Sequence, residues 1–425
     1  MNKYKIQEKL FNIYCLYDVI MMSLHQKMNP QMQRKIQNRK LRKLVKTAYK
    51  NPFYKERFDN ARVRPEDIKT KEDLKRLPVL TKGEYREWML NELKKPETQF
   101  FKLTHTSGST GIPTTNIFPP REYATHYMAD FFGWIKGGYN PFWGKSLTKQ
   151  PGDAAVGMNS FVQKLGILRR ECFDTRWERK SIIEKINNYK PDFILANSSE
   201  LLYIAQYSLE HEIPLCKPKY YCPNGENIEG LAEKRLRDVY GDGLINLYGC
   251  TEMGSFATRG PEDSGYYITE DLVVANVVDD NGSGEGNLLV TPLYRTYYPL
   301  INYEIGDVVH LEVKGGLDYI SRIKGRKEEA FVWEDGSQTI FMRLYDITKE
   351  LSDIYQIRFI QESCEKVIFQ VVRDTSSEES YESLEEYLRK MYRSQFPQDI
   401  KIEIQWLKVI PPDPNGKIRM MISKI

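Results

Sequence analysis

Cysteine and histidine are scarce in this sequence, and neither has the spacing of a common metal or redox motif. The six cysteines contain no Cys-x-x-Cys pair, and they stand at Cys15, Cys172, Cys216, Cys222, Cys250 and Cys364. The five histidines form no His-Glu-x-x-His motif. These absences exclude zinc-finger, dithiol and zincin chemistry by motif, and they favour reduced thiols in a cytoplasmic protein.

Long apolar runs are also missing. The most apolar stretch near the N-terminus runs from Leu10 to Leu24, and Asn12, Asp18 and Ser23 interrupt it. A bilayer-spanning helix needs about 20 apolar residues, so this stretch is too short and too polar. No small-residue cleavage site follows it, so we expect no secretory signal. An amphipathic helix, packed on the protein body or lying on a membrane surface, fits the pattern.

Composition and charge indicate a soluble globular protein with a basic beginning. Hydrophobic residues make up 41% and charged residues 28% of the sequence. Its length of 425 residues suggests two or three domains. The first fifty residues contain twelve Lys or Arg against only Glu8 and Asp18. We interpret this leader as a solvated helical face with no nucleic-acid partner. A peripheral membrane contact is the alternative.

The order of apolar patterns predicts an α/β protein. Residues 1–60 read as a basic helical leader, with helical periodicity from Arg34 to Tyr49. Strand-like runs at 99–103, 190–196 and 244–248 alternate with helical stretches, one of which begins at Ser198 or Ser199. This alternation favours a largely parallel sheet. Residues 270–325 read as a β-rich subdomain, and a small α+β unit follows residue 326.

A loop rich in glycine and hydroxyls follows the first of these runs. Thr104–Gly111 reads Thr-His-Thr-Ser-Gly-Ser-Thr-Gly. Such a loop can bring backbone N–H groups and small hydroxyls close to phosphate oxygens. A surface turn is the alternative, and a Walker loop is excluded because no Gly-Lys-Ser/Thr follows.

Four further clusters occur downstream in a fixed order: Tyr248–Glu252, Tyr303–Asp307, Gly325-Arg326 and Asn415-Gly416-Lys417. Each has an ordinary structural alternative. The first could be a helix N-cap at Thr251, and the last a β-turn with a solvated lysine. Asp307 and Arg326, taken singly, could be surface charges.

Taken together, the five clusters resemble the adenylate-forming acyl-ligase superfamily, and most of all its phenylacetate–CoA ligase/CapK branch. The resemblance implies a large N-terminal AMP-binding domain with layered mixed and parallel sheets and a β-rich subdomain, over residues 1–325. A small mobile α+β domain, carrying the catalytic lysine, would follow over 326–425.

The resemblance also implies roles for individual residues. Tyr248 and Gly249 would bind adenine, Thr251 would contact the α-phosphate, and Glu252 would hold Mg²⁺. Asp307 and Arg326 would bind the ribose, Lys417 would bridge the acyl carboxylate and the α-phosphate, and Glu328 would be the hinge. The phosphate loop would comprise Thr106, Ser107, Gly108, Ser109, Thr110 and Gly111. A weaker adenine-binding match comprises Asn224, Gly225 and Glu226.

Two departures from the family pattern carry information. Ile112 stands where a lysine is common, so positive charge for the phosphates must come from elsewhere. Residues 256–267 contain neither Cys nor His, although several relatives carry a zinc cluster there, so we expect no zinc.

The implied activity is an ATP- and Mg²⁺-dependent ligase that makes an acyl-adenylate from a small carboxylic acid and passes the acyl group to coenzyme A. Alternative acceptors are a carrier protein, an amine or a sugar, and a non-catalytic nucleotide-binding module is the alternative of another class. Aromatic residues favour an aromatic or small apolar acid, with ordinary core packing as the alternative: Tyr127, Phe131, Phe132, Trp134, Tyr139, Phe142, Trp143, Phe161 and Phe256.

Overall fold

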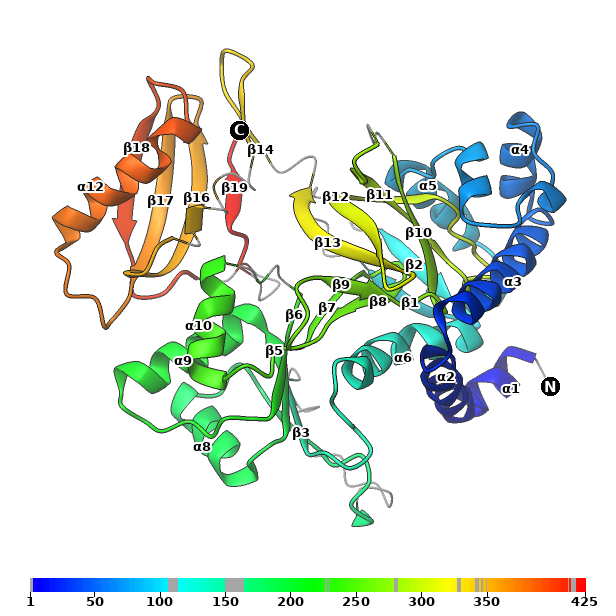
Figure 1. Ribbon diagram of the computed structural model, residues 1–425, viewed down its shortest axis with the longest axis horizontal. Coiled ribbons are helices and arrows are strands. Elements are labelled where there is room, and N and C mark those ends of the chain that lie inside the picture. Colours follow the sequence, from blue (N-terminus) through cyan, green and yellow to red (C-terminus); the bar gives the residue numbers. More distant parts are fainter. Residues whose placement is uncertain are drawn as a thin grey trace. The chain divides into compact units, whose positions relative to one another are not determined.

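The protein forms two compact units, each built from two separate stretches of sequence (Figure 1). Unit 1 comprises Met1–Gly138 and Leu247–Lys327, and unit 2 comprises Tyr139–Asn246 and Glu328–Ile425. The structure is a computed structural model that describes residues 3–105, 114–149, 164–225, 228, 230–278, 282–326, 330–340, 344, 347–348, 350–411, 413 and 418–425.

Four helices open unit 1: α1 (Lys3–Lys9), α2 (Phe11–Gln26), α3 (Pro30–Ala48) and α4 (Pro52–Asn60). Both α3 and α4 begin with an Asn-Pro pair. The Asn29 side chain accepts a hydrogen bond from the Met32 N–H at 2.9 Å, and Asn51 accepts one from Phe53 at 3.0 Å. Proline at the first helical position has no N–H to leave unsatisfied, so each pair starts a helix efficiently.

Helix α3 confirms the helix predicted from Arg34 to Tyr49 and shows why its apolar residues recur at helical spacing. The residues buried along it are Ile36, Gln37, Leu41, Leu44, Val45 and Ala48. They recur every three or four positions and so form one stripe that packs against the body of unit 1. The basic residues between them occupy the other faces of the helix.

The remainder of this stretch contains short helices and one hairpin. Its elements are η1 (Pro65–Asp67), η2 (Glu72–Arg76), α5 (Lys82–Glu92), η3 (Pro96–Phe100), β1 (Lys102–His105), β2 (Thr115–Phe118) and α6 (Pro120–Lys136). The strand predicted at 99–103 is wrong in position, because a 3-10 turn occupies Pro96–Phe100 and the strand begins only at Lys102. Pro96 favours the turn, since it occupies the first helical position.

A seven-stranded sheet forms the centre of unit 1. Its strands are β7 (Asn246–Cys250), β8 (Gly254–Arg259), β9 (Tyr266–Ile268), β10 (Val273–Val278), β11 (Glu285–Pro292), β12 (Tyr303–Lys314) and β13 (Leu317–Arg326). Their order in the sheet is β10-β11-β12-β13-β9-β8-β7. β10 and β11 pair antiparallel, and both lie within residues 270–325, which the sequence predicts to be β-rich. Figure 1 shows α2 and α6 side by side next to this sheet.

Unit 2 contains a parallel sheet, as the sequence predicts, but of the three strand-like runs only 190–196 belongs to it, as part of β5. The run at 244–248 contributes to β7 of the seven-stranded sheet instead. Strands β3 (Ser146–Lys149), β4 (Arg170–Phe173), β5 (Phe193–Asn197) and β6 (Tyr220–Asn224) pair in the order β4-β3-β5-β6, all parallel. Helices α8 (Arg179–Tyr189), α9 (Ser198–Glu210) and α10 (Gly230–Tyr240) lie together on one side of these strands (Figure 1). The mixed α/β class is therefore confirmed.

The second stretch of unit 2 forms a small α+β layer. Its elements are β14 (Ala330–Val332), β15 (Gln338–Ile340), β16 (Ile354–Ser363), β17 (Lys366–Arg373), α12 (Tyr381–Tyr392), η5 (Arg393–Gln395), β18 (Lys401–Trp406) and β19 (Met421–Ser423). The sheet order is β18-β17-β16-β19. Leu384, Leu388 and Tyr392 of α12 pack against Val367 and Phe369 of β17 in one buried cluster.

The two stretches of unit 2 share a core. The Tyr355 hydroxyl donates to the Leu202 carbonyl at 2.8 Å, and Arg235 pairs with Asp374 at 2.5 Å. Ile410 is fully buried in the same apolar cluster as the α9 residues. The chain passes from unit 1 to this unit between Lys327 and Glu328.

Candidate active site

The Tyr-Gly-x-Thr-Glu segment connects two antiparallel strands of unit 1. Tyr248, Gly249 and Cys250 end β7, residues 251–253 form a turn, and β8 begins at Gly254. The alternative in which Thr251 caps a helix is wrong, because a strand follows the turn. The sequence could not distinguish the two, since Thr and Glu suit a helix start as well as a tight turn.

Two residues predicted to bind nucleotide meet in the fold. The Tyr248 hydroxyl donates a hydrogen bond of 2.6 Å to Oδ2 of Asp307, although 59 positions separate the two in sequence. The Tyr248 ring also lies against Phe256, with ring centroids 5.3 Å apart. Asp307 is the cross-strand partner of Arg326 in the β12–β13 pair. A side-chain hydrogen bond and a strand pairing thus link three predicted residues.

Glu252 has an almost fully buried side chain, only 4% exposed. Its Oε1 accepts a hydrogen bond from the Tyr303 hydroxyl at 3.0 Å, so the first residue of one motif fixes the last residue of another. Burial and the Glu252 carboxylate raise the pKa of the Cys250 thiol well above its usual range. They also raise the pKa of the Tyr303 hydroxyl. Both neighbours therefore stay protonated.

Arg295 supports the turn from behind, and sequence reasoning missed it. This arginine is fully buried. Its guanidinium donates to the Glu252 carbonyl at 2.7 Å and to the Ile117 carbonyl at 3.0 Å, and it lies 4.3 Å from the centroid of the Phe118 ring. The only sequence signal that could have identified it is its position as a single arginine among apolar and aromatic residues.

Glu122 holds the segment that follows Arg295 and was also missed. Its Oε1 accepts hydrogen bonds from the Thr296 N–H at 2.7 Å, the Thr296 hydroxyl at 2.9 Å and the Tyr297 N–H at 2.7 Å. Burial raises the pKa of this carboxyl, whereas Arg295 and the three donors lower it. Glu122 on α6 therefore positions Arg295, which in turn positions Glu252.

Steric crowding explains why position 249 of the motif is a glycine. A Cβ on Gly249 would lie 2.2 Å from the Gly254 carbonyl oxygen and 2.5 Å from the Ser255 Cα. Both atoms belong to the backbone of the neighbouring strand, which cannot swing aside as a side chain can. Only glycine therefore permits β7 and β8 to approach this closely.

Replacing Gly249 by alanine is expected to lower the free energy of unfolding by about 1–3 kcal/mol, as overpacking usually does. Urea denaturation of purified protein measures it. Gly83→Ala is the matched control, because a Cβ there would meet nothing closer than 4.0 Å, and we expect unchanged or slightly higher stability. Equal effects from the two changes would contradict the steric explanation.

His126 lies beside this cluster on α6, with its ring 4.4 Å from that of Phe118 and its Nδ1 3.3 Å from the Tyr294 hydroxyl. Burial, and secondarily the Arg295 charge, lower the pKa of His126 to about 3. The folded state therefore holds this imidazole neutral at a pH where the unfolded chain already protonates it.

Because His126 stays neutral in the folded state, we expect the protein to lose stability in mild acid. As the pH falls below the unfolded pKa of about 6.5, the unfolded state binds a proton that the folded state does not. Between pH 6.5 and pH 5 we expect a loss of about 1–2 kcal/mol. His126→Asn should flatten the pH dependence of urea midpoints, and His211→Asn, at an exposed histidine, should not. Parallel curves for all three proteins would refute this assignment.

Other predicted site residues are placed elsewhere or lie outside the described part of the chain. Asn224 ends β6 in unit 2, and Gly225 follows it with φ of +82°. Arg326 is described only through its backbone. The following predicted residues lie outside the described ones: Thr106, Ser107, Gly108, Ser109, Thr110, Gly111, Glu226, Glu328 and Lys417.

Several aromatic residues proposed for an acyl pocket are core residues instead. Phe132, Tyr139 and Phe256 are at most 3% exposed, whereas Tyr127 and Trp143 are more than half exposed. The core-packing alternative is therefore correct for the first three. Among the described residues no group of three or more His, Cys, Asp or Glu side chains could hold a metal ion.

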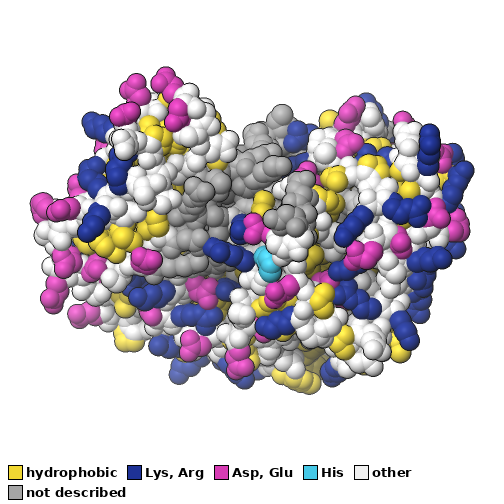
Figure 2. Space-filling view, turned by 45° about the horizontal axis from the view of Figure 1, so that its top comes forward, with side chains coloured by type: hydrophobic (Ala, Val, Ile, Leu, Met, Phe, Trp, Pro, Cys, Tyr) yellow, Lys and Arg dark blue, Asp and Glu magenta, His cyan; other side chains and the backbone are white. Residues whose placement is uncertain are grey.

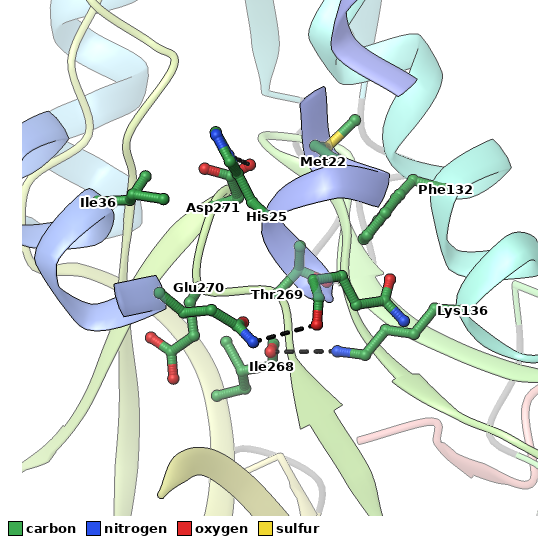
Figure 3. A pocket seen from close by; sticks show the side chains of 11 residues that line it. Met22, His25, Ile36, Phe132, Lys136, Ile268, Thr269, Glu270 and Asp271 are labelled. Carbon is green, nitrogen blue, oxygen red and sulfur yellow. Dashed lines mark hydrogen bonds and ion pairs between the residues drawn. The ribbon is translucent and has the colours of Figure 1, made fainter. Parts of the chain in front are cut away.

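A small hollow, partly open to solvent, lies elsewhere in unit 1 (Figure 3). It is lined by α2, α3, α6 and the segment 268–271, and none of its residues belongs to the predicted site. Lys136 donates to the Ile268 carbonyl at 3.2 Å, and burial lowers the pKa of Lys136 to about 8. His25 and Asp271 face each other 2.7 Å apart. The hollow is the seam at which the N-terminal helices meet the sheet.

Comparison with known sequences finds distant relatives over most of the chain. A family model described as the CapK C-terminal domain matches residues 331–424. Protein CapK of Staphylococcus aureus is 23% identical over 410 residues, which are 92% of this chain and 89% of that protein. Phenylacetate-coenzyme A ligase of Aromatoleum evansii is 25% identical over 334 residues, 70% of this chain and 71% of that enzyme.

Comparison with solved structures finds a similar fold. A 2-hydroxyisobutyryl-CoA ligase in the postadenylation state, in complex with 2-HIB-AMP, has a TM-score of 0.73 at 18% identity, covering 93% of this chain and 90% of that one. The same ligase with 2-HIB-AMP and CoA in the thioesterification state has a TM-score of 0.58 at 19% identity, with the same coverage. At these identities the likeness concerns the fold.

Proposed function

Because the chain belongs to the adenylate-forming ligase superfamily, in its CapK/phenylacetate–CoA ligase-like branch, we propose that it activates a carboxylic acid with ATP. The carboxylate oxygen attacks the α-phosphorus, the bond to the bridging oxygen breaks, and pyrophosphate leaves with that electron pair. The product is an acyl-adenylate. In the second step a thiol attacks the acyl carbon, AMP leaves, and coenzyme A is the proposed thiol.

The observation that carries this proposal is the Tyr248–Asp307 hydrogen bond. A carboxylate can accept hydrogen bonds from both ribose hydroxyls, and it does so in unrelated nucleotide sites. Tyr248 fixes Asp307 for that contact while its ring offers a surface for adenine. Arg326, on the neighbouring strand, is proposed as the second ribose contact. Gly249 allows the tight strand pair that presents Tyr248.

Glu252 is the proposed ligand for Mg²⁺, and Thr251 the proposed contact for the α-phosphate. A carboxylate is the hard oxygen donor that this ion prefers. Mg²⁺ is usually bound by only one or two protein carboxylates, and water and phosphate oxygens complete its coordination. One oxygen of Glu252 is held by Tyr303, which orients the other. When bound, the ion would neutralise phosphate charge as two anions approach each other.

Residues that lie mostly outside the described part complete the proposal. Thr106–Gly111 would supply N–H groups and hydroxyls to the β- and γ-phosphates, with Asn224, Gly225 and Glu226 as a further adenine contact. Lys417 would bridge the acyl carboxylate and the α-phosphate, because an ammonium on a flexible stem can reach a site built by another domain. We retain 1–325 and 326–425 as proposed domains, with Glu328 as their hinge. Residues 328–425 share a core with 139–246 in this structure, so the rotation proposed to gate the second step would have to separate that core.

The acceptor and the acid are open to direct measurement. Similarity to CapK covers more of the chain than similarity to the phenylacetate ligase, 92% against 70%. A carrier-protein thiol, an amine and a sugar hydroxyl are the alternative acceptors and should be tested beside coenzyme A. We place the activity in the cytoplasm, where ATP and coenzyme A are available.

The first test is acid-dependent pyrophosphate release with Mg·ATP across aryl, short-chain, long-chain and amino acids, with hydroxylamine as a trap. We expect one class of acid to drive release. Lys417→Ala should reduce it on the order of 100- to 1000-fold, as loss of one transition-state contact does elsewhere. Adding each acceptor then shows which one consumes the acyl-adenylate. ATP binding without release for any acid would favour a non-catalytic nucleotide-binding module.

A further inference from the structure

Helix α2 exposes an apolar face. Among the described residues, eight of the 21 exposed large hydrophobic side chains lie between Ile6 and Met32. Those on α2 are 48–62% exposed, and they are Ile13, Leu16, Tyr17, Ile20 and Leu24. They recur every three or four residues and therefore form one stripe along the helix. Scattered exposed leucines need no explanation, but a continuous stripe indicates a binding surface.

The opposite face of α2 fixes the helix in this orientation. Cys15, Asp18, Val19 and Met22 are buried. Both carboxylate oxygens of Asp18 accept hydrogen bonds of 2.6 Å from Arg121 of α6. The charged residue of the helix therefore points inward, and the apolar stripe points to solvent. Turning α2 over would break the Asp18–Arg121 ion pair and leave Arg121 without its partner, which is costly for a largely buried charge.

Helix α3 is held on the body in the same way. Arg34 pairs with Asp318 at 2.6 Å, and Lys40 pairs with Asp271 at 2.5 Å. Figure 3 shows Asp271 together with His25 at the end of α2. Buried acids of the sheet thus neutralise the inward-facing cations of the leader. Other cations of α3 are exposed to solvent, although Arg42 also donates a hydrogen bond of 3.3 Å to the Lys69 carbonyl.

The outward cations form a second stripe. Helix α3 contains seven Lys or Arg and no acidic residue. Those on its exposed side recur at helical spacing, and they are Lys35, Arg39, Arg42, Lys43 and Lys46. Exposed Lys27 and Met28 lie in the turn between α2 and α3, and exposed Met32 lies in the first turn of α3. In Figure 2 the dark-blue side chains gather at the right-hand edge, on the side where Figure 1 places α3 and α4.

We propose that this combined surface, the α2 apolar stripe and the α3 basic stripe, docks the protein on an anionic lipid membrane. An interfacial helix places apolar side chains below the headgroups while Lys and Arg contact lipid phosphates. Helix α2 has 16 residues and is about 24 Å long, shorter than the hydrocarbon core of about 30 Å. No helix among the described residues is long and apolar enough to cross a bilayer. The helix therefore lies in the plane of the membrane.

Charge favours lipid over a second copy of the chain. A two-fold dimer uses the same patch on each subunit, so it would bring together two surfaces with the same excess of basic residues and no acidic residue on α3 to offset it. An anionic bilayer complements that charge. It also accepts apolar side chains, which a nucleic-acid backbone does not.

The test is flotation of the full-length protein with equimolar phosphatidylglycerol/phosphatidylcholine vesicles and with pure phosphatidylcholine vesicles. We expect binding to the anionic vesicles that weakens with salt. Leu16→Glu/Leu24→Glu should reduce partitioning about 100-fold, roughly tenfold for each leucine removed from the interface. The matched control is Leu90→Glu/Leu209→Glu, at leucines of similar exposure on α5 and α9, and it should bind as the wild type does.

A second pair separates charge from apolar contact. Lys43→Gln/Lys46→Gln should lower partitioning about fivefold per lysine, whereas Lys180→Gln/Lys390→Gln, at exposed lysines of α8 and α12, should have no effect. Pyrophosphate release in buffer should stay unchanged in all four variants, so this test is independent of the proposed catalytic function.

Three results would overturn the proposal. The first is no flotation of the wild type with anionic vesicles. The second is a dimer in analytical ultracentrifugation that Leu16→Glu/Leu24→Glu dissociates while vesicle binding persists, which would assign the surface to a second copy. The third is equal loss of binding in the stripe variants and their controls.

Discussion

Replacing Glu252 by glutamine is expected to lower the rate of adenylation on the order of 100- to 1000-fold while leaving the fold intact. Glutamine has the same shape and can still accept the Tyr303 hydrogen bond. It lacks the negative charge that makes a carboxylate a strong ligand for Mg²⁺. The loss should match that of other residues that stabilise charge in a transition state. The measurement is the single-turnover rate of pyrophosphate release across a Mg²⁺ titration.

Two further variants serve as comparisons for Glu252→Gln. Glu262→Gln makes the same change at an exposed glutamate of the same unit and should leave the rate unchanged. Tyr303→Phe removes only the hydroxyl that orients Glu252, and we expect a smaller loss, about tenfold. A wild-type rate and Mg²⁺ dependence for Glu252→Gln would show that the ion is held elsewhere.

Replacing Arg295 by methionine is expected to lower the free energy of unfolding by about 3–5 kcal/mol, as breaking a buried charge contact does. Methionine can fill much of the volume but donates no hydrogen bond. The carbonyls of Glu252 and Ile117 would lose their donors, and the buried Glu122 carboxyl would lose a neighbouring cation. Urea denaturation followed by tryptophan fluorescence measures the change.

Arg39→Met is the control for this variant. Arg39 is exposed on α3, so its replacement should change stability by less than about 0.5 kcal/mol. Adenylation at a temperature where Arg295→Met is still folded should also fall, because the turn that carries Glu252 loses its support. A stable and fully active Arg295→Met protein would refute a positioning role for this arginine.

Much of the architecture was predictable because it depends on local chemistry. The apolar spacing of α3, the run that becomes β5 and the turn-rich break between β10 and β11 are each set by residues close in sequence. The order of the motifs also indicated that distant segments would converge, and Tyr248 and Asp307 do meet. The nucleotide roles of these residues remain proposals, because a sequence order does not fix what a site binds.

Local reasoning failed where a distant residue decided the outcome. Thr251 has the residue type of a helix cap, but the partner strand β8 determines that a turn forms there. Arg295 and Glu122 were missed because a lone charged residue is usually exposed. Their burial is explained only by the carbonyls and N–H groups that other segments direct at them.

Helix α2 marks the boundary between what sequence determined and what tertiary structure decided. By itself the sequence determined that this segment is an amphipathic helix too short to span a bilayer. Hydrophobicity alone would bury Ile20 and expose Asp18, whereas the fold does the opposite. The reason is the paired hydrogen bonds from Arg121, 103 residues away, which satisfy the carboxylate inside the protein and leave the apolar stripe facing outward.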